Sequence, residues 1–181
     1  MTDATFEAFV RTHQDMVFGT AVRLLGNAAE AEDVAQTVFL KAFERFQEVG
    51  TSDTAAGWLR TVTRNLCLNH LSRYRSRWRL FSELRRSGAR DDDEEYEASL
   101  VAAEVSPGAA LEAADRHEQL EAALRRLPRH QRVPLVLFHF EQASYQEIAV
   151  TLSVSVAKVK SDIHRGREAL KKHLAADDGI R

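Results

Sequence analysis

The stretch SYQEIAVTLSVSVAKVKSDIHRGREALKKHL, residues 144–174, decides how the fold of this chain is interpreted. Its first half places Ile148, Ala149 and Leu152 on one side of a helix. After a short Ser-Val-Ser break, a second apolar period follows among Lys and Arg side chains, at Val156, Val159, Ile163 and Leu170. Two short helices across a tight turn, the second of them basic, are typical of a DNA-binding helix-turn-helix. An ordinary solvated basic helix has the same composition, so that alternative stays open here.

Charge is divided along the chain in a way that the net charge of −2 conceals. Residues 60–90 hold nine Arg and one Glu, and residues 122–174 hold ten basic and four acidic side chains. Residues 91–121 between them hold eleven acidic side chains and one Arg. Binding to phosphates depends on local basic patches and not on the charge of the whole chain. An acidic protein with two basic segments is therefore compatible with DNA binding.

Composition indicates a soluble helical protein. The chain is 44% hydrophobic and 29% charged, and its apolar residues recur at spacings of three and four, which favours an all-α fold. No apolar run approaches the roughly 20 residues that span a bilayer, and the N-terminus lacks the features of a signal peptide. A single cysteine, Cys67, fits a reducing compartment. We therefore expect a cytoplasmic protein with no membrane contact of its own.

The pattern predicts two small helical domains, residues 1–86 and 109–176, joined by a flexible acidic linker over residues 87–108. In the first domain we expect helices over about 5–25, from Asn27 onward, and over about 58–79. Asn27 is placed to cap the second helix, with Glu30 completing a variant of the capping box. In the second domain the expected helices cover about 109–126, 129–141, 144–152 and 155–174. Residues 50–57 are expected to form a polar loop.

The second basic patch is RTVTRNLCLNHLSRYRSRWR, residues 60–79. Arg neutralises phosphates, the interleaved Tyr74 and Trp78 could stack on exposed bases, and Asn65 and Asn69 could pair with base edges. This mixture suits single-stranded or distorted DNA better than a regular duplex. The alternative is a solvated basic face whose aromatic residues belong to the core.

Catalytic and metal chemistry find little support in the sequence. Cys67 and His70 stand at CxxH spacing, but a zinc site needs about four ligands, so a buried thiol and a surface His are favoured. The sequence contains no nucleophile elbow, no Gly-rich phosphate loop and no HExxH motif. We expect no cofactor and no enzymatic activity.

Three segments, in order, resemble those of the ECF (extracytoplasmic function) sigma factors of bacterial RNA polymerase. They are NAAEAEDVAQTVFLKAFERF, GWLRTVTRNLCLNHLSR and LRRLPRHQRVPLVLFHFEQASYQEIAVTLSVSVAKVKSDIHRGREALKK. The resemblance covers nearly the whole chain except the acidic linker and the last few residues. It implies two helical domains that bind the −10 and −35 promoter elements, and a role in promoter recognition and melting. The implied partners are promoter DNA, core RNA polymerase through its β′ clamp helices and β flap, and an anti-sigma factor.

The same resemblance assigns expected roles to individual residues. Segment 32–39 resembles the part that docks on the β′ clamp helices, with Asp33, Gln36 and Phe39 as its expected contacts. Asn65 resembles a position near the −10 base, and the loop from Val49 to Ala56 resembles a pocket for a flipped-out base. The full −10 prediction comprises Trp58, Arg64, Asn65, Asn69 and Arg73. The −35 prediction comprises Lys158, Lys160, Ser161, His164, Arg165 and Arg167.

The chain departs from the family pattern at several of these positions. Arg60 stands where an aromatic is frequent, Asp162 and His164 stand where basic and aromatic residues are frequent, and Ser153 replaces the usual turn glycine. A positive φ is less easily reached by serine than by glycine. The competing hypothesis is a stand-alone helix-turn-helix regulator with a helical sensor domain, although a sensor has little use for the basic patch at 60–79. A helical enzyme lacks a convergent catalytic set.

Overall fold

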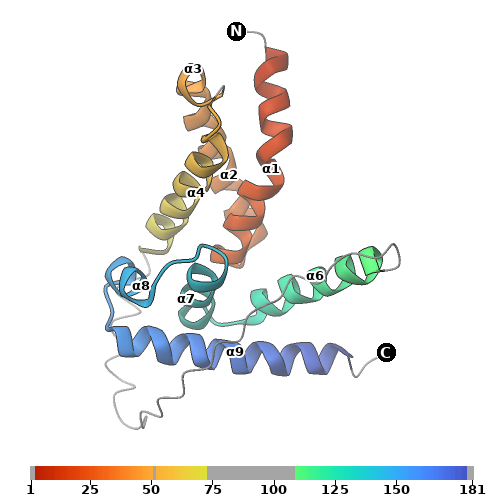
Figure 1. Cartoon of the computed structure of the whole chain (residues 1–181), viewed down its shortest axis with the longest axis vertical. Helices are drawn as coiled ribbons and strands as arrows, with labels where there is room; N and C mark the ends of the chain where they lie inside the picture. Colours follow the sequence, from red (N-terminus) through yellow and green to blue (C-terminus); the bar gives the residue numbers. More distant parts are fainter. Residues whose placement is uncertain (1–2, 51, 73–108, 179–181) are drawn as a thin grey trace.

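The computed structural model describes residues 3–50, 52–72 and 109–178, and every regular element in those ranges is a helix (Figure 1). The N-terminal group consists of α1 (Asp3–Leu25), α2 (Ala28–Glu44), α3 (Phe46–Val49) and α4 (Ala55–Ser72). The C-terminal group consists of α6 (Ala109–Arg126), α7 (Arg129–His139), α8 (Tyr145–Leu152) and α9 (Val156–Asp178). The predicted all-α fold with two helical regions is confirmed. The predicted linker at 87–108 lies outside the described residues.

Helix boundaries differ from the expected ones by a few residues. The third expected helix begins at Ala55 and not near residue 58, so the expected polar loop is shorter, and α3 is an additional short helix before it. The last helix runs on to Asp178. The expected segment 73–79 lies outside the described residues. Within the described ranges, no helix combines the length and apolar character needed to cross a bilayer.

The junction between α1 and α2 follows from local sequence. Gly26 ends α1 with a φ of 68°, in the left-handed region that glycine enters readily. The Asn27 side chain then accepts hydrogen bonds from the backbone N–H groups of Ala29 and Glu30, at 3.0 and 3.2 Å, which confirms the predicted N-cap. The Glu30 side chain, predicted to complete a capping box, instead pairs with His70 at 3.3 Å and Arg129 at 3.6 Å.

The N-terminal group packs α1, α2 and α4 around a shared apolar core. Fully buried side chains come from all three helices: Val17, Ala21, Leu24, Val38, Ala42, Leu59 and Cys67. Each fully buried Val or Leu contributes about 1.5–3 kcal/mol relative to an exposed one. The helical period that places Val34, Val38 and Ala42 inward also predicts an inward Phe43, but this side chain is 46% exposed and makes an edge contact with Phe6. It lies beside the buried stripe of α2, which runs through Ala31, Val34, Val38 and Ala42.

The C-terminal group contains the predicted helix-turn-helix, formed by α8 and α9. A capping box starts α8: the Ser144 hydroxyl accepts from the Glu147 N–H at 3.2 Å, and the Glu147 carboxylate accepts from the Ser144 N–H at 2.8 Å. Ser153 ends α8 at φ 55° and ψ 47°, so this serine occupies the left-handed conformation that glycine adopts more easily. Val159 and Ile163 of α9 are buried against the preceding helices.

Candidate nucleic-acid interface

The outer face of α9 presents the residues predicted to read duplex DNA. Lys160, His164 and Arg165 are exposed and Ser161 is half-buried. Lys160 and His164 are four residues apart, as are Ser161 and Arg165. The four side chains therefore lie next to one another across one turn of the helix. Two cations, an imidazole and a hydroxyl on an exposed helical face can contact phosphates and base edges in a major groove.

Two other cations predicted for this face are engaged within the C-terminal group. The Lys158 ammonium pairs with the Asp162 carboxylate, which is buried. The Arg167 Nε donates to His139 Nε2 at 3.1 Å, and its guanidinium lies 5.5 Å from the centre of the Phe138 ring. The Arg167 contacts link α9 to α7, whereas the Lys158–Asp162 pair lies within α9, and both sets hold a cation close to the protein. The i,i+4 spacing of Lys158 and Asp162 could have indicated the first pair.

Burial lowers the pKa of His139, and the neighbouring Arg167 lowers it further. The imidazole is therefore neutral at physiological pH and accepts the hydrogen bond from Arg167. Protonation would place two cations against each other in a half-buried setting.

On α4, the residues predicted for single-stranded DNA share one side of the helix. Asn65 and Asn69 are exposed and lie one turn apart, Trp58 is half-buried two turns before Asn65, and Arg64 is half-buried beside it. Arg73 lies outside the described residues. This side of α4 presents amide, aromatic and guanidinium groups together, and its role in DNA binding stays a prediction; Tyr74 and Trp78 lie outside the described residues.

Cys67 and His70 take part in different contacts. The Cys67 thiol is fully buried, and burial chiefly, with Glu141 adding, raises its pKa to about 12. The His70 imidazole instead faces the Glu30 carboxylate. Their roles in packing and ion pairing agree with the favoured interpretation of this pair.

A separate exposed surface lies on α2. Asp33 and Gln36, predicted to contact the polymerase, are exposed, and Phe39 is half-buried against the core. Beside them Leu40 and Phe43 are 65% and 46% exposed. Exposed large apolar residues grouped with polar ones are typical of protein-binding surfaces. Sequence reasoning missed Leu40 and assigned Phe43 to the core, because helical periodicity does not show how wide the buried stripe is.

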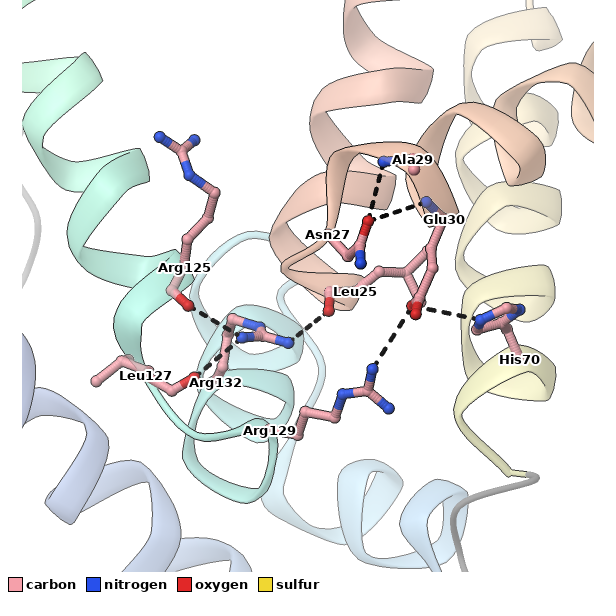
Figure 2. A network of polar contacts seen from close by, with 9 residues as sticks. All are labelled: Leu25, Asn27, Ala29, Glu30, His70, Arg125, Leu127, Arg129 and Arg132. Atoms are coloured by element: carbon pink, nitrogen blue, oxygen red, sulfur yellow. Dashed lines mark hydrogen bonds and ion pairs between the residues drawn. The ribbon is translucent and has the colours of Figure 1, made fainter.

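The two helical groups meet where α1 ends. Arg132 of α7 is only 4% exposed, and its guanidinium donates to the backbone carbonyl of Leu25 at 2.6 Å and to that of Leu127 at 2.9 Å (Figure 2). A Cβ atom on Gly26 would lie 2.3 Å from this guanidinium. Burial, as the largest cause, lowers the pKa of Arg132 to about 10, so the group stays charged at neutral pH.

Further polar contacts also join the two helical groups. The Arg23 Nε lies 2.5 Å from the Glu121 carboxylate, and its guanidinium lies 4.7 Å from the centre of the Phe140 ring. Arg129 pairs with Glu30 at 3.6 Å (Figure 2).

A cleft of about 490 Å³ lies between α4 and a wall formed by α8 and the segment that joins α7 to α8. Its α4 wall includes Arg64, Asn65 and Leu68, and its other wall includes Glu141 and Glu147. Burial raises the pKa of Glu141, while Arg60, Arg64 and Arg23 act against that rise. All three arginines belong to the N-terminal group, and Arg64 lines the same cleft as Glu141.

In comparison with known proteins, each helical group matches a family model. The sigma-70 region 2 family model matches residues 9–78, and the sigma-70 region 4 model matches residues 117–170. The ECF RNA polymerase sigma factor SigE of Mycolicibacterium smegmatis is 35% identical over 94% of the chain, which spans 62% of that relative's length.

Two further relatives are covered more fully. The ECF RNA polymerase sigma factor SigW of Bacillus subtilis is 29% identical over 93% of the chain and 88% of its own length. The RNA polymerase sigma-H factor of Pseudomonas aeruginosa is 31% identical over 93% of the chain and 86% of its own length. Among solved structures, the sigma factor RpoE in complex with the anti-sigma factor NepR, from Bartonella quintana, is similar with a TM-score of 0.47, 20% identity and coverage of 95% and 98% of the two chains.

Proposed function

The chain belongs to the ECF group of sigma-70 family RNA polymerase sigma factors. From that membership we propose which described surface binds each promoter element and which binds core polymerase. The exposed face of α9 binds the −35 element, the Asn65 side of α4 binds the −10 element, and the α2 surface docks on core polymerase. The observation that carries this assignment is the order of the two region matches, each of which falls on a group that exposes polar or basic side chains on one helix.

The wider setting follows from the same membership. Sigma factors of this family are specificity subunits of RNA polymerase and carry no catalytic site, and we propose the same for this chain. We propose a cytoplasmic location, an anti-sigma factor as the inhibitory partner, and residues 87–108 as the linker between domains 1–86 and 109–176. No observation favours the stand-alone regulator.

Reconstitution with core RNA polymerase tests the whole assignment. The purified chain should direct transcription from a subset of fragments in a promoter library, and core polymerase alone should not. Absence of promoter-dependent transcripts from an assembled holoenzyme would contradict the proposed function.

The −35 assignment is tested with Lys160→Ala and Arg165→Ala, made together. Each lost phosphate contact should lower the salt-dependence slope of duplex binding by about 1. Arg125→Ala removes one charge from an exposed position on α6 and serves as the control. Unchanged affinity and slope in the double variant would contradict the role of α9.

The polymerase-docking assignment is tested with Leu40→Glu. Because Leu40 is already 65% exposed, the substitution should leave the fold intact while placing a carboxylate in an apolar contact. Capture of core polymerase should fall, whereas Ala8→Glu, at an exposed position on α1, should bind as the parent does. Equal capture by both variants would remove α2 from the docking surface.

The −10 assignment is tested with Asn65→Ala in the holoenzyme. A base that leaves the stack needs contacts that compensate a few kcal/mol of unstacking, so open-complex formation should suffer. Permanganate reactivity of thymines near the start site should fall while closed complexes still form. Equal reactivity in variant and parent would rule out this role.

A further inference from the structure

One ion pair in α9 lies beside the face proposed to bind the −35 element. The Lys158 ammonium pairs with the Asp162 carboxylate one helical turn later. The two side chains differ in exposure, which is 34% for Lys158 but only 7% for Asp162. The carboxylate is therefore the anchored partner, and the ammonium is the partner that a ligand can still reach.

Lys158 has the position of a base-contacting residue. It lies in the first turn of α9, which begins next to α8 (Figure 1), and the N-terminal residues of a recognition helix are those that contact base edges. The Ser155 hydroxyl supports this turn by accepting a hydrogen bond from the Lys158 N–H at 3.2 Å. Ser161 and Arg165 follow three and seven positions after Lys158, so the three side chains share one flank of the helix.

Asp162 changes what Lys158 can offer to DNA. An ammonium carries three N–H donors, and the contact with Asp162 needs one of them. The pair as a whole is neutral, so it lacks the net charge that releases counterions at a phosphate. Moving the ammonium away to a phosphate would leave the Asp162 carboxylate buried without its partner, which is unfavourable. The remaining donors can still reach acceptors on a base edge, such as O6 and N7 of guanine in the major groove.

We propose that Asp162 is a positioning residue that holds the Lys158 ammonium as a neutral, oriented donor, which reads a base with adjacent acceptors, as guanine has, and does not bind phosphate. This proposal rests on the proposed function, because it takes the outer face of α9 as the −35 binding one. Phosphate contacts strengthen binding to every sequence, whereas base contacts choose among sequences. A lysine used in this way strengthens binding to the preferred element and leaves binding to all other DNA unchanged.

The test uses holoenzyme reconstituted from core RNA polymerase and the full chain. The parent holoenzyme selects duplexes from a randomised library, and sequencing of the bound fraction gives the base preference at each position. Affinity for a selected duplex is then measured between about 50 and 200 mM salt, which gives the salt-dependence slope. Both measurements are repeated for each variant, and far-UV circular dichroism checks that the variant keeps its helical content.

Lys158→Gln and Asp162→Asn remove the two ends of the ion pair one at a time. Lys160→Gln, at an exposed position two residues away, is the matched control for the lysine substitution. Glu168→Gln is the matched control for the loss of a negative charge from α9. Glu168 and its partner Lys171 are 49% and 71% exposed, and an ion pair as exposed as this holds its side chains weakly.

Lys158→Gln should relax the preference at one base position by at least about fivefold and leave the salt-dependence slope at its parent value. Lys160→Gln should instead lower that slope by about 1. Asp162→Asn should relax the same base position as Lys158→Gln, because the ammonium is no longer held. It should also raise the slope by about 1, because the released lysine binds a phosphate. Glu168→Gln should keep the base preference of the parent.

Two results would overturn the proposal. A slope that falls by about 1 in Lys158→Gln, as in Lys160→Gln, would make Lys158 an ordinary phosphate-binding cation. An unchanged base preference in Asp162→Asn, or one relaxed at a different position, would show that Asp162 does not position the ammonium. If either variant loses its helical content, the other decides against its own control. A parent holoenzyme that assembles but enriches no sequence would contradict the proposed function itself, and the parent chain alone reveals that failure.

Discussion

Replacing Arg132 by Ala should destabilise the protein far more than replacing any exposed arginine. The Arg132 guanidinium donates to the carbonyl oxygens of Leu25 and Leu127, and both oxygens lose a charged donor in the variant. A hydrogen bond from a charged group contributes about 1.5–3 kcal/mol, so two of them give about 3–6 kcal/mol. The variant no longer has to bury a guanidinium, which offsets part of this loss.

We therefore expect Arg132→Ala to lower the free energy of unfolding by about 3 kcal/mol, a large part of a typical total of 5–15 kcal/mol. For a chain of this length the melting temperature should fall by about 6–12 °C. Urea unfolding followed by far-UV circular dichroism measures the change. Arg125→Ala, at an exposed position, should stay within about 0.5 kcal/mol of the parent.

Gly26→Ala gives an independent check on the same contact. Its left-handed φ costs an alanine about 1–2 kcal/mol, and the added Cβ would also displace the Arg132 guanidinium. In the Arg132→Ala background only the backbone cost should remain, so the two substitutions should couple by more than about 1 kcal/mol. Strict additivity, or an Arg132→Ala variant as stable as Arg125→Ala, would refute the reasoning.

Three further predictions concern single residues elsewhere in the fold. Ser153→Gly should raise the melting temperature, because glycine relieves roughly 0.5–1 kcal/mol of left-handed strain, and a lower melting temperature would contradict this. Cys67 has a pKa raised to about 12 by burial, so iodoacetamide at about pH 8 should modify the folded protein far more slowly than the urea-unfolded one. The pKa of His139 is lowered below 6.5, so the unfolded state takes up its proton first and stability should fall as pH drops below about 6.5. His139→Gln should flatten that fall in urea midpoints between about pH 7.5 and about pH 5.5, and an unchanged slope would assign it to other groups.

Local signals in the sequence predicted the local parts of the fold. Asn27 caps α2 as expected because an N-cap depends on residues only two and three positions away. The end of α8 after Leu152 was predictable because the apolar period of the sequence breaks there and starts again at Val156. The outer face of α9 was also predictable, since the inward positions Val159 and Ile163 fix which side remains exposed.

These local signals do not identify partners that lie far away in the sequence. Glu30 was predicted to cap its own helix, but His70 and Arg129 lie close enough to pair with it. The DNA contact of Arg167 stays a prediction, and the structure adds a partner that the sequence did not indicate: His139, 28 positions earlier, accepts its hydrogen bond. Arg132 carries no distinguishing local pattern, and its importance comes from a carbonyl 107 positions away.

The manner in which Arg132 joins the two groups has a consequence for how the chain can drift in evolution. The atoms it contacts at positions 25 and 127 are carbonyl oxygens, which every amino acid carries. The two hydrogen bonds therefore do not depend on the side chains at those positions, which are held instead by their burial in the core. Position 26 differs, since any Cβ there meets the guanidinium. Among descendants of this chain, loss of the glycine should accompany loss of the arginine, and an alignment of relatives would show positions 26 and 132 changing together.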